Sequence, residues 1–418
     1  MVENKSEEYS QEDLRDMLKI YYKRLFPAKN FFRWLTYSNS EPQIFQNREF
    51  SFTLADEVYI RYLSYENSNE FEADLYAKSP FKIDIGAVMT IRPRDHRVGN
   101  VQPTQRELVF DIDMTDYDEV RTCCSGADIC QKCWKFMVVA CRILDESLRE
   151  DFNFEHILWV FSGRRGIHCW VCDKTARHLD NKNRNAVAEY LNFFTSNRVI
   201  LPGDRMHHSM KRAHRIVETY FDEICLNDQN IFGTIDGRKK LLELISDENI
   251  RKELEKSIMD IEAGDSKTVW DTVKRFAQTH RNQKEVQRKL KFMIEEIQMS
   301  ILCPRLDISV SKTANHLLKA PFCVHPKTGK VCVPFNPSAV SKFDPTTVPR
   351  LRQLLKEVDE FDKKDGEDGG EKARIALTYR KTAMYKSVII FEEFLRKLES
   401  SHKNAGTKLE TSDAKMEF

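Results

Sequence analysis

The chain has 418 residues, of which 41% are hydrophobic and 31% are charged, and its formal net charge is +1. This length accommodates two domains, or one domain with a large insertion. No apolar run approaches the roughly 18 residues of a membrane span, and the polar, acidic start MVENKSEEYS argues against a secretory signal peptide. A net charge near zero excludes a basic field over the whole surface, so any contact with nucleic acid has to be a local patch.

The N-terminal part combines helices with short strands. Ser10 and the acid Asp13 three residues later predict a helix N-cap, and this helix ends near Pro27. Alternating residues predict two strands within 48–63 and another within 81–91. Charged residues inside strand-like runs most simply face solvent, and Glu49 and Arg61 are two of them. Asp84 instead sits among apolar neighbours, where a charge is less easily accommodated.

The run ELVFDIDMTDYDEV carries two carboxylates side by side. Asp111 and Asp113 flank Ile112, so alternation along a strand directs both acids to one face and Ile112 into the core. An unpaired ionised carboxylate in a low-dielectric site costs several kcal/mol or more, and a hard cation such as Mg²⁺ or Mn²⁺ is the usual partner. Polymerases and nucleases use a pair of such ions on phosphates. Two solvated aspartates that cap a strand are the alternative.

Four cysteines follow within a short loop, TCCSGADICQKCW. Cys130 and Cys133 have the spacing of a zinc half-site, and the adjacent Cys123 and Cys124 would supply the other half. Four thiolates leave no open coordination position, so the predicted site is structural and fixes the loop 121–134. Incidental buried thiols are the alternative. The total of 11 cysteines in a chain without a secretion signal argues against a disulfide framework.

A glycine-bracketed loop with two arginines lies between predicted strands at 157–161 and 167–171. Glycine permits close approach of the backbone to a ligand, and arginine offers paired donors to phosphate oxygens. A surface hairpin with solvated arginines is the alternative. The residues of this predicted phosphate-binding segment are Ser162, Gly163, Arg164, Arg165, Gly166 and His168.

The chain changes character after the arginine loop. Residues 178–300 have helical periodicity, which predicts a helical insertion. The basic stretch 274–291 within it is most simply a solvated helix face, with a partner or nucleic-acid surface as the alternative. Alternation returns at 305–312, which predicts a strand carrying a third carboxylate, Asp307, although a solvent-facing edge remains open. The segment after it contributes His316, Lys319 and His325.

Several of these segments resemble one known family. VFDIDMTDYDEV, CC-x5-C-x2-C, SGRRGIHCWVCD, RLDISVSK and NHLLKAPFCVHPKTG are similar to motifs of the small-subunit family of eukaryotic DNA primases, in the archaeo-eukaryotic primase superfamily. The resemblance is very specific at 105–175 and 303–336, fair at 40–92 and weak at 176–300.

The resemblance implies an α/β (α+β) fold, in which a mixed-sheet primase catalytic domain with an RRM-like core carries a helical insertion and a structural zinc loop. We therefore expect residues 1–177 and 301–400 to form the catalytic core. The helical subdomain would occupy 178–300, and the tail 401–418 would be disordered.

The resemblance also implies site roles. Asp84 would hydrogen-bond the ribose 2′-hydroxyl and so favour ribonucleotides. The catalytic group comprises Glu49, Asp111, Asp113 and Asp307, the last three holding Mg²⁺ or Mn²⁺. The nucleotide-binding group comprises Arg61, Asp84, Ser162, Gly163, Arg164, Arg165, Gly166, His168, His316, Lys319 and His325. The structural zinc group comprises Cys123, Cys124, Cys130 and Cys133.

The activity that the resemblance implies is de novo synthesis of short RNA primers from NTPs on a single-stranded DNA template, by two-metal nucleotidyl transfer. It also implies a heterodimer with the primase large subunit, assembly with the catalytic and accessory subunits of DNA polymerase alpha, and residence in the nucleus, without a membrane partner. A primase–polymerase that prefers deoxynucleotides, a metal-dependent nuclease and a non-enzymatic zinc-containing scaffold are the alternatives.

Overall fold

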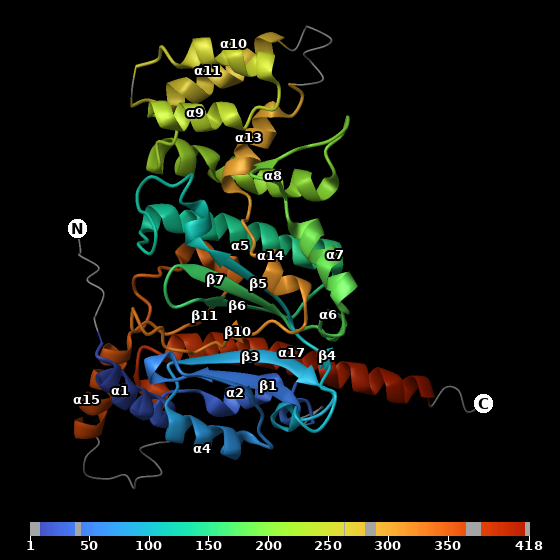
Figure 1. Ribbon diagram of the computed structural model, residues 1–418, viewed down its shortest axis with the longest axis vertical. Coiled ribbons are helices and arrows are strands. Elements are labelled where there is room, and N and C mark those ends of the chain that lie inside the picture. Colours follow the sequence, from blue (N-terminus) through green and yellow to red (C-terminus); the bar gives the residue numbers. More distant parts are fainter. Residues whose placement is uncertain (1–8, 38–42, 263, 281–289, 365–377, 414–418) are drawn as a thin grey trace.

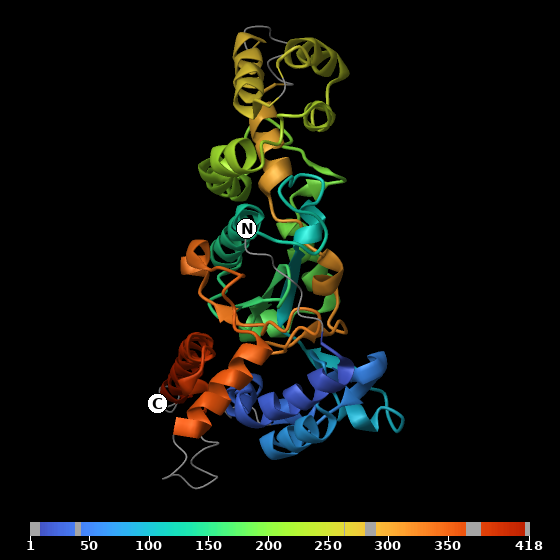
Figure 2. The same ribbon diagram turned by 90° about the vertical axis from the view of Figure 1, so that its left-hand side faces the viewer.

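The computed structural model describes residues 9–37, 43–262, 264–280, 290–364 and 378–413. It shows an elongated molecule in three tiers, with one sheet at one end, a second sheet in the middle and a group of helices at the other end (Figures 1 and 2). Helices and antiparallel sheets are mixed, so the predicted α+β class is confirmed. In the described part of the chain, no helix has both the length and the apolar character needed to cross a membrane.

The first sheet has the strand order β10-β3-β1-β2, and β4 pairs with β3. Alternation sends Phe50 and Phe52 to one face, where Phe50 packs against Phe71 with ring centroids 5.3 Å apart. Ser51 and Asp84 therefore lie on the opposite face, which is turned toward the second sheet. The strands are β1 (Arg48–Thr53), β2 (Tyr59–Leu63), β3 (Lys82–Met89), β4 (Pro103–Gln105) and β10 (Leu318–Lys319).

N-terminal helices pack against this sheet. The predicted cap is confirmed, since the Ser10 side chain accepts a hydrogen bond from the Asp13 backbone amide at 3.1 Å. The helix that it begins buries Leu14, Leu18 and Tyr21 on one side. The helices are α1 (Gln11–Arg24), α2 (Ala28–Leu35), α3 (Gln43–Gln46) and α4 (Ser68–Lys78).

The second sheet has the order β11-β6-β7-β5 and lies between helices on both faces. α5 (Gln131–Phe152) covers one face, where Trp159 donates to Asp145 of α5 at 2.9 Å. On the other face, Trp170 packs edge-on against Trp34 of α2, with ring centroids 5.3 Å apart. The strands are β5 (Leu108–Asp113), β6 (Ile157–Phe161), β7 (Gly166–Val171) and β11 (Pro334–Phe335).

The third tier is helical and has a core of its own around Trp270, whose ring lies 4.7 Å from that of Phe221 and 5.8 Å from that of Phe232. Figure 1 shows α13 leading from this tier back to the sheets. Between β7 and α13 the elements are α6 (Lys174–Arg177), α7 (Asn181–Leu191), β8 (Phe194–Thr195), β9 (Arg198–Val199), α8 (His208–Phe221), η4 (Asp222–Asp228), α9 (Ile235–Glu243), α10 (Glu248–Ile258) and α11 (Ser266–Thr279), followed by α13 (Met293–Leu302).

Three expectations differ from the structure. The strand predicted at 305–312 is wrong, because Asp307 caps a short helix, α14 (Ile308–Lys312), and its side chain accepts from the Ser309 amide at 3.1 Å. The strand pairs recorded within the described residues are all antiparallel, so the sheets are not mixed in direction. After α15 (Leu351–Lys364), α17 (Tyr385–Asp413) continues helical through most of the tail predicted to be disordered; residues 414–418 lie outside the described residues.

Candidate active site and metal centre

The two acids of β5 share one face of the second sheet. Asp111 lies opposite His168 of β7, and Asp113 lies opposite Gly166. A Cβ atom at Gly166 would approach the carbonyl oxygen of Ile112 to 2.4 Å, so the two strands need glycine at this point. Because Trp170 is two residues after His168, this face is the one turned away from α5 and toward the first sheet.

Asp307 reaches the same place from a helix start. Its backbone amide donates to the carbonyl oxygen of Asp111 at 3.2 Å. The Ser311 hydroxyl of α14 donates to the carbonyl oxygen of Val109 at 2.5 Å, which fixes the short helix against β5. The Asp307 carboxylate itself accepts from the Ser309 hydroxyl at 2.6 Å. The structure therefore brings the third acid next to the first two, although it is nearly 200 residues away in the chain.

The electrostatics of the acids differ. Burial raises the pKa of Asp111 to about 6, and the neighbouring charge of Asp113 adds to the shift. Burial also acts to raise the pKa of Asp113, but hydrogen bonds from Thr115 and the Arg165 guanidinium outweigh it and hold that pKa below its usual value. Arg165 Nε lies 2.7 Å and 3.0 Å from the two carboxylate oxygens of Asp113. Asp111 thus carries a charge that its protein surroundings do not fully compensate.

The three acids are neighbours rather than a closed ligand set. Within the described residues, the four loop cysteines are the set whose ligand atoms lie within 4.8 Å of one another, and no such set of three carboxylates occurs there. Asp111, Asp113 and Asp307 nevertheless line one cavity of about 800 Å³. Hard oxygen donors around one cavity, one of them with a raised pKa, suit Mg²⁺ or Mn²⁺.

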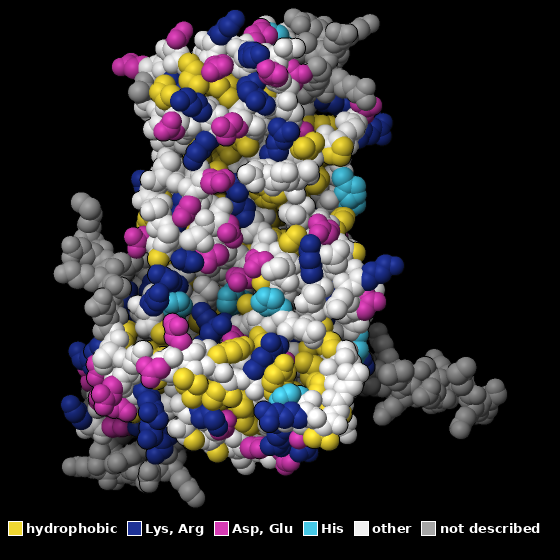
Figure 3. Space-filling view, viewed as in Figure 1, with side chains coloured by type: hydrophobic (Ala, Val, Ile, Leu, Met, Phe, Trp, Pro, Cys, Tyr) yellow, Lys and Arg dark blue, Asp and Glu magenta, His cyan; other side chains and the backbone are white. Residues whose placement is uncertain are grey.

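Basic side chains line the same cavity beside the acids. Figure 3 shows Lys, Arg and His side chains gathered at the waist between the two sheets. Burial lowers the pKa of His168 and of His325 to about 3, with Lys319 as the next cause, so both rings are neutral at pH 7. The predicted nucleotide-binding residues in the cavity lining are Ser162, Arg164, Arg165, Gly166, His168, His316, Lys319 and His325.

Two distant segments form the basic part of the cavity lining by direct contact. Gly163 has a φ of +87°, and a Cβ atom there would lie 2.8 Å from that of His325. Lys319 Nζ donates to the carbonyl oxygen of Ser162 at 3.3 Å, and the Thr328 hydroxyl donates to that of Gly163 at 2.7 Å. The arginine loop and the Lys/His segment therefore form one cradle for anionic oxygens.

Some predicted site residues lie beside the cavity rather than in its lining, namely Glu49, Arg61, Asp84 and Gly163. Asp84 lies between Ser51 and Lys319 in the register of the first sheet, and Lys82 Nζ is 3.0 Å from its carboxylate. Glu49 is fully buried and pairs with Arg61 Nε at 2.8 Å. The two residues predicted to face solvent as isolated charges are therefore partners of each other.

Sequence reasoning missed three charged residues near the acids. Lys82 and Lys327 line the cavity. Lys82 could have been found, because it lies two residues before Asp84 and so on the same strand face. Asp116 has a pKa raised to about 6 by burial and then by the charges of Asp113 and Asp111. No sequence pattern separates it from the other acids of MTDYDEV.

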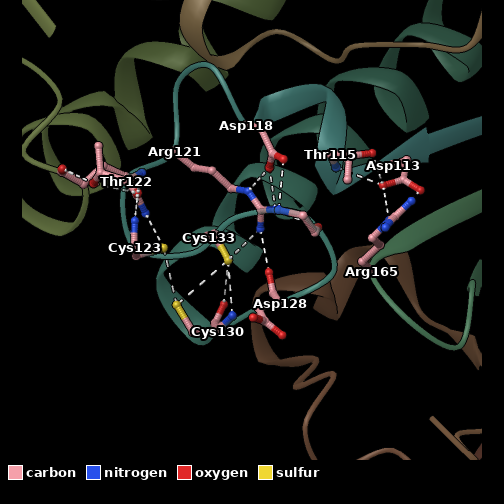
Figure 4. A network of polar contacts seen from close by, with 12 residues as sticks. Asp113, Thr115, Asp118, Arg121, Thr122, Cys123, Asp128, Cys130, Cys133 and Arg165 are labelled. Carbon is pink, nitrogen blue, oxygen red and sulfur yellow. Dashed lines mark hydrogen bonds and ion pairs between the residues drawn. The ribbon is translucent and has the colours of Figure 1, made fainter. Parts of the chain in front are cut away.

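The cysteine cluster is the second candidate centre. The sulfur atoms of Cys123 and Cys130 are 3.5 Å apart, and those of Cys130 and Cys133 are 3.9 Å apart. Figure 4 shows these three side chains converging from the loop and the start of α5. A tetrahedral ion with bonds of about 2.3 Å separates its sulfur ligands by about 3.8 Å. With Cys124 completing the set, the cluster can hold a metal such as zinc.

Comparison with known proteins places the chain among close relatives. A profile of the family described as DNA primase small subunit matches residues 110–337. The chain is 56% identical over 414 residues to the DNA primase small subunit of Drosophila melanogaster, covering 95% of this chain and 94% of that protein. It is 39% identical over 358 residues to that of Schizosaccharomyces pombe, covering 84% of this chain and 79% of that protein.

More distant proteins also match. The small subunit PriS of Archaeoglobus fulgidus is 26% identical over 311 residues, covering 73% of this chain and 78% of that protein. Among solved structures, the polymerase domain of Mycobacterium tuberculosis ligase D in complex with DNA aligns at a TM-score of 0.37 and 10% identity, over 86% of this chain and 93% of that one.

Proposed function

The chain belongs to the DNA primase small-subunit family and is a DNA primase of the nucleotidyltransferase class, and we propose that it makes short RNA primers de novo from NTPs on single-stranded DNA. The observation that carries this proposal is the single cavity lined both by three acids and by arginine, lysine and histidine side chains. A nuclease has no triphosphate to hold, whereas a polymerase needs both the acids and the basic side chains.

The acids would hold two divalent ions, Mg²⁺ or Mn²⁺, which supply activation of an attacking 3′-hydroxyl and charge neutralisation on the leaving pyrophosphate. Arg164, Arg165 and Lys319 would bind the triphosphate and orient it in line with that hydroxyl. The neutral rings of His168 and His325 would contribute N–H donors rather than charge. Arg165 now pairs with Asp113 and would turn to phosphate when a cation occupies that carboxylate.

Template-dependent dinucleotide synthesis tests this proposal. Purified wild-type chain should form a dinucleotide from ATP on poly(dT), and an Asp111→Ala/Asp113→Ala variant should form none. Product from the variant at the wild-type rate would reject the assignment of these acids. Cleavage of labelled DNA without NTP incorporation would favour the nuclease.

We expect Asp84→Ala to weaken the preference for ribonucleotides. Asp84 is 2% exposed and is held by Ser51 and Lys82 on the sheet face beside the cavity. Loss of a hydrogen bond to a substrate hydroxyl costs about 1–3 kcal/mol, which corresponds to a loss of discrimination of roughly 5- to 150-fold. The ratio of kcat/KM for ATP to that for dATP measures it, with Ser51→Ala as a control that loosens Asp84 but keeps the carboxylate. An unchanged ratio would place the ribose elsewhere.

Metal binding should depend on pH through Asp111. Its pKa of about 6 means that protons compete with a cation at and below pH 6. We expect the affinity for Mn²⁺, measured by electron paramagnetic resonance without nucleotide, to be constant from pH 7 to 8 and to fall about tenfold per unit below pH 6. Asp111→Asn should remove this dependence. Equal affinities at pH 5 and 7.5 in the wild type would contradict it.

Zn²⁺ is our assignment for the cysteine cluster, because four thiolates in tetrahedral reach suit a structural ion.

As a small subunit, the chain forms a complex with a large subunit. We propose that this complex joins the catalytic and accessory subunits of DNA polymerase alpha in the nucleus. A net charge of +1 implies a weak grip on template, so the large subunit would supply much of that binding. Equal initiation rates with and without the large subunit would reject this division of labour.

A further inference from the structure

The cysteine loop is held from one side by a buried guanidinium. The side chain of Arg121 is fully buried, and its Nη1 donates to Cys133 Sγ at 3.8 Å and to the carbonyl oxygen of Asp128 at 2.7 Å. Its Nη2 donates to the carbonyl oxygen of Gly126 at 2.9 Å, and its Nε donates to the Asp118 carboxylate at 2.6 Å. One side chain thus connects the loop to the end of the acidic segment, as Figure 4 shows.

The same loop is held from the other side by the helical tier. Gln229, which directly follows η4, is 2% exposed. Its Oε1 accepts from the backbone amides of Thr122 at 2.7 Å and Cys123 at 3.2 Å, and its Nε2 donates to Cys123 Sγ at 3.3 Å. Lys135 of α5 pairs with Glu223 and Asp228 of η4 next to this contact. The helical tier therefore docks on the cysteine loop through a buried amide.

The negative charge of a metal–thiolate cluster explains why Arg121 and Gln229 donate to the cysteine sulfur atoms. A divalent ion with four thiolates carries a net charge of −2, and this charge is only partly open to solvent. Donors to ligand sulfur atoms reduce the cost of that charge and fix the orientation of the ligands. Arg121 offers a full positive charge to Cys133, and Gln229 offers an N–H dipole to Cys123.

The loop also connects to the catalytic acids. Asp113 caps η3 (Met114–Tyr117) by accepting from the Thr115 amide at 2.9 Å, and Asp118 follows the last residue of η3. The contact between Asp118 and Arg121 therefore connects the cysteine loop to Asp113 through the single short helix η3.

We propose that Arg121 and Gln229 are positioning residues of the cysteine loop, and that the loop with its bound metal is the joint that holds the helical tier against the Asp113 segment. The inference rests on the proposed metal centre. It assigns the metal a role at a distance from catalysis, namely fixing two neighbouring segments. Without the metal, the thiols regain protons and no ion links the four ligands, so the joint would loosen on both sides.

Gln229→Glu is the sharpest variant. It retains the oxygen that accepts from Thr122 and Cys123, but it replaces the donor to the Cys123 sulfur by a negative charge. Gln278→Glu adds the same charge at an exposed position of α11 and is the matched control. Arg121→Lys keeps the positive charge but removes the planar set of guanidinium N–H donors. We measure metal content per full-length chain and the rate of metal transfer to a chromophoric chelator. Transfer should be about 10- to 100-fold faster in the two joint variants and unchanged in the control.

Hydrogen exchange supplies a readout that does not need a variant. On removal of the metal from the wild type, exchange should accelerate at 114–122 and 222–232 but not in 385–398 of α17. Two results would contradict the proposed joint without contradicting the metal centre. One is a Gln229→Glu variant that binds one metal per chain and transfers it at the wild-type rate. The other is hydrogen exchange that stays unchanged at both segments after the metal is removed. A wild-type chain that holds no metal would overturn both.

Discussion

Asp111→Asn should abolish primer synthesis and at the same time stabilise the metal-free protein. Loss of a carboxylate that binds a catalytic ion should lower kcat by about 10³-fold or more. The stability effect has the opposite sign, because burial and the charge of Asp113 raise the pKa of Asp111 to about 6, against about 3.9 in the unfolded chain. The ionised carboxylate therefore opposes folding at pH 7. The side chain is about one-third exposed, so we expect a discounted gain of about 1–2 kcal/mol.

The pH profile checks the sign of this effect. The unfolded chain releases the proton of Asp111 at lower pH than the folded chain does, so the wild type should gain stability as pH falls from 7 toward 4 through this group. Asp111→Asn should lack this contribution. Urea unfolding in buffer without Mg²⁺ or Mn²⁺ measures it, and dinucleotide formation measures activity.

Asp116→Asn is the matched control. Asp116 also has a pKa raised to about 6 by burial and neighbouring acids, but it does not line the cavity. It should therefore gain stability as Asp111→Asn does and retain synthesis. Loss of synthesis in both variants would add Asp116 to the catalytic group, and destabilisation of Asp111→Asn would contradict the electrostatic account.

Local patterns predicted those features of the fold that depend only on residues close together in the sequence. Alternation in β5 placed Asp111 and Asp113 on one face, and the cysteine spacing indicated a closed cluster. Both signals lie within a few residues, where strand geometry or ligand spacing acts directly. The same holds for Ser10, whose hydroxyl caps α1 within one turn.

Expectations were wrong where a local pattern allowed two structures. RLDISVSK alternates like a strand, but Asp307 offers a side chain that caps a helix, and contact of Ser311 with β5 decides between the two. Glu49 and Arg61 read as separate solvated charges, because only the pairing of β1 with β2 brings them together. The charge balance of a buried residue depends on partners far away in the chain, which a single sequence does not display.

Glu107 is the strongest case of such a partner, and Glu107→Gln should destabilise the fold severely. Glu107 is fully buried and accepts from Arg48 at 2.6 Å and 2.9 Å, from Arg106 at 3.1 Å and from the Tyr37 hydroxyl. Arg48 belongs to the first sheet, whereas Glu107 directly precedes β5 in the second. Removal of the acid leaves two buried guanidiniums without their counter-charge, which costs about 3–5 kcal/mol.

The dependence of this network on pH follows from the pKa of its carboxylate. Burial acts to raise the pKa of Glu107, but Arg48 and Arg106 outweigh it and hold the pKa far below the usual value of about 4.3. The contribution of the carboxylate is therefore fully present above about pH 4.3 and is lost only as pH falls toward the depressed folded value. The difference between the wild type and Glu107→Gln in the free energy of unfolding should consequently be the same at pH 5 and pH 8.

Urea unfolding of Glu107→Gln beside Glu248→Gln provides the measurement. Glu248 pairs with Lys252 on the exposed face of α10, so its replacement should leave the free energy of unfolding nearly unchanged. Because Arg106 also donates to the carbonyl oxygen of His316 at 3.3 Å, the network positions this cavity-lining residue as well as β5. We therefore expect any folded fraction of Glu107→Gln to show a raised KM for NTPs. A cost below 1 kcal/mol would mean that the two sheets are held together by apolar packing alone, and the charge network would then have no structural role.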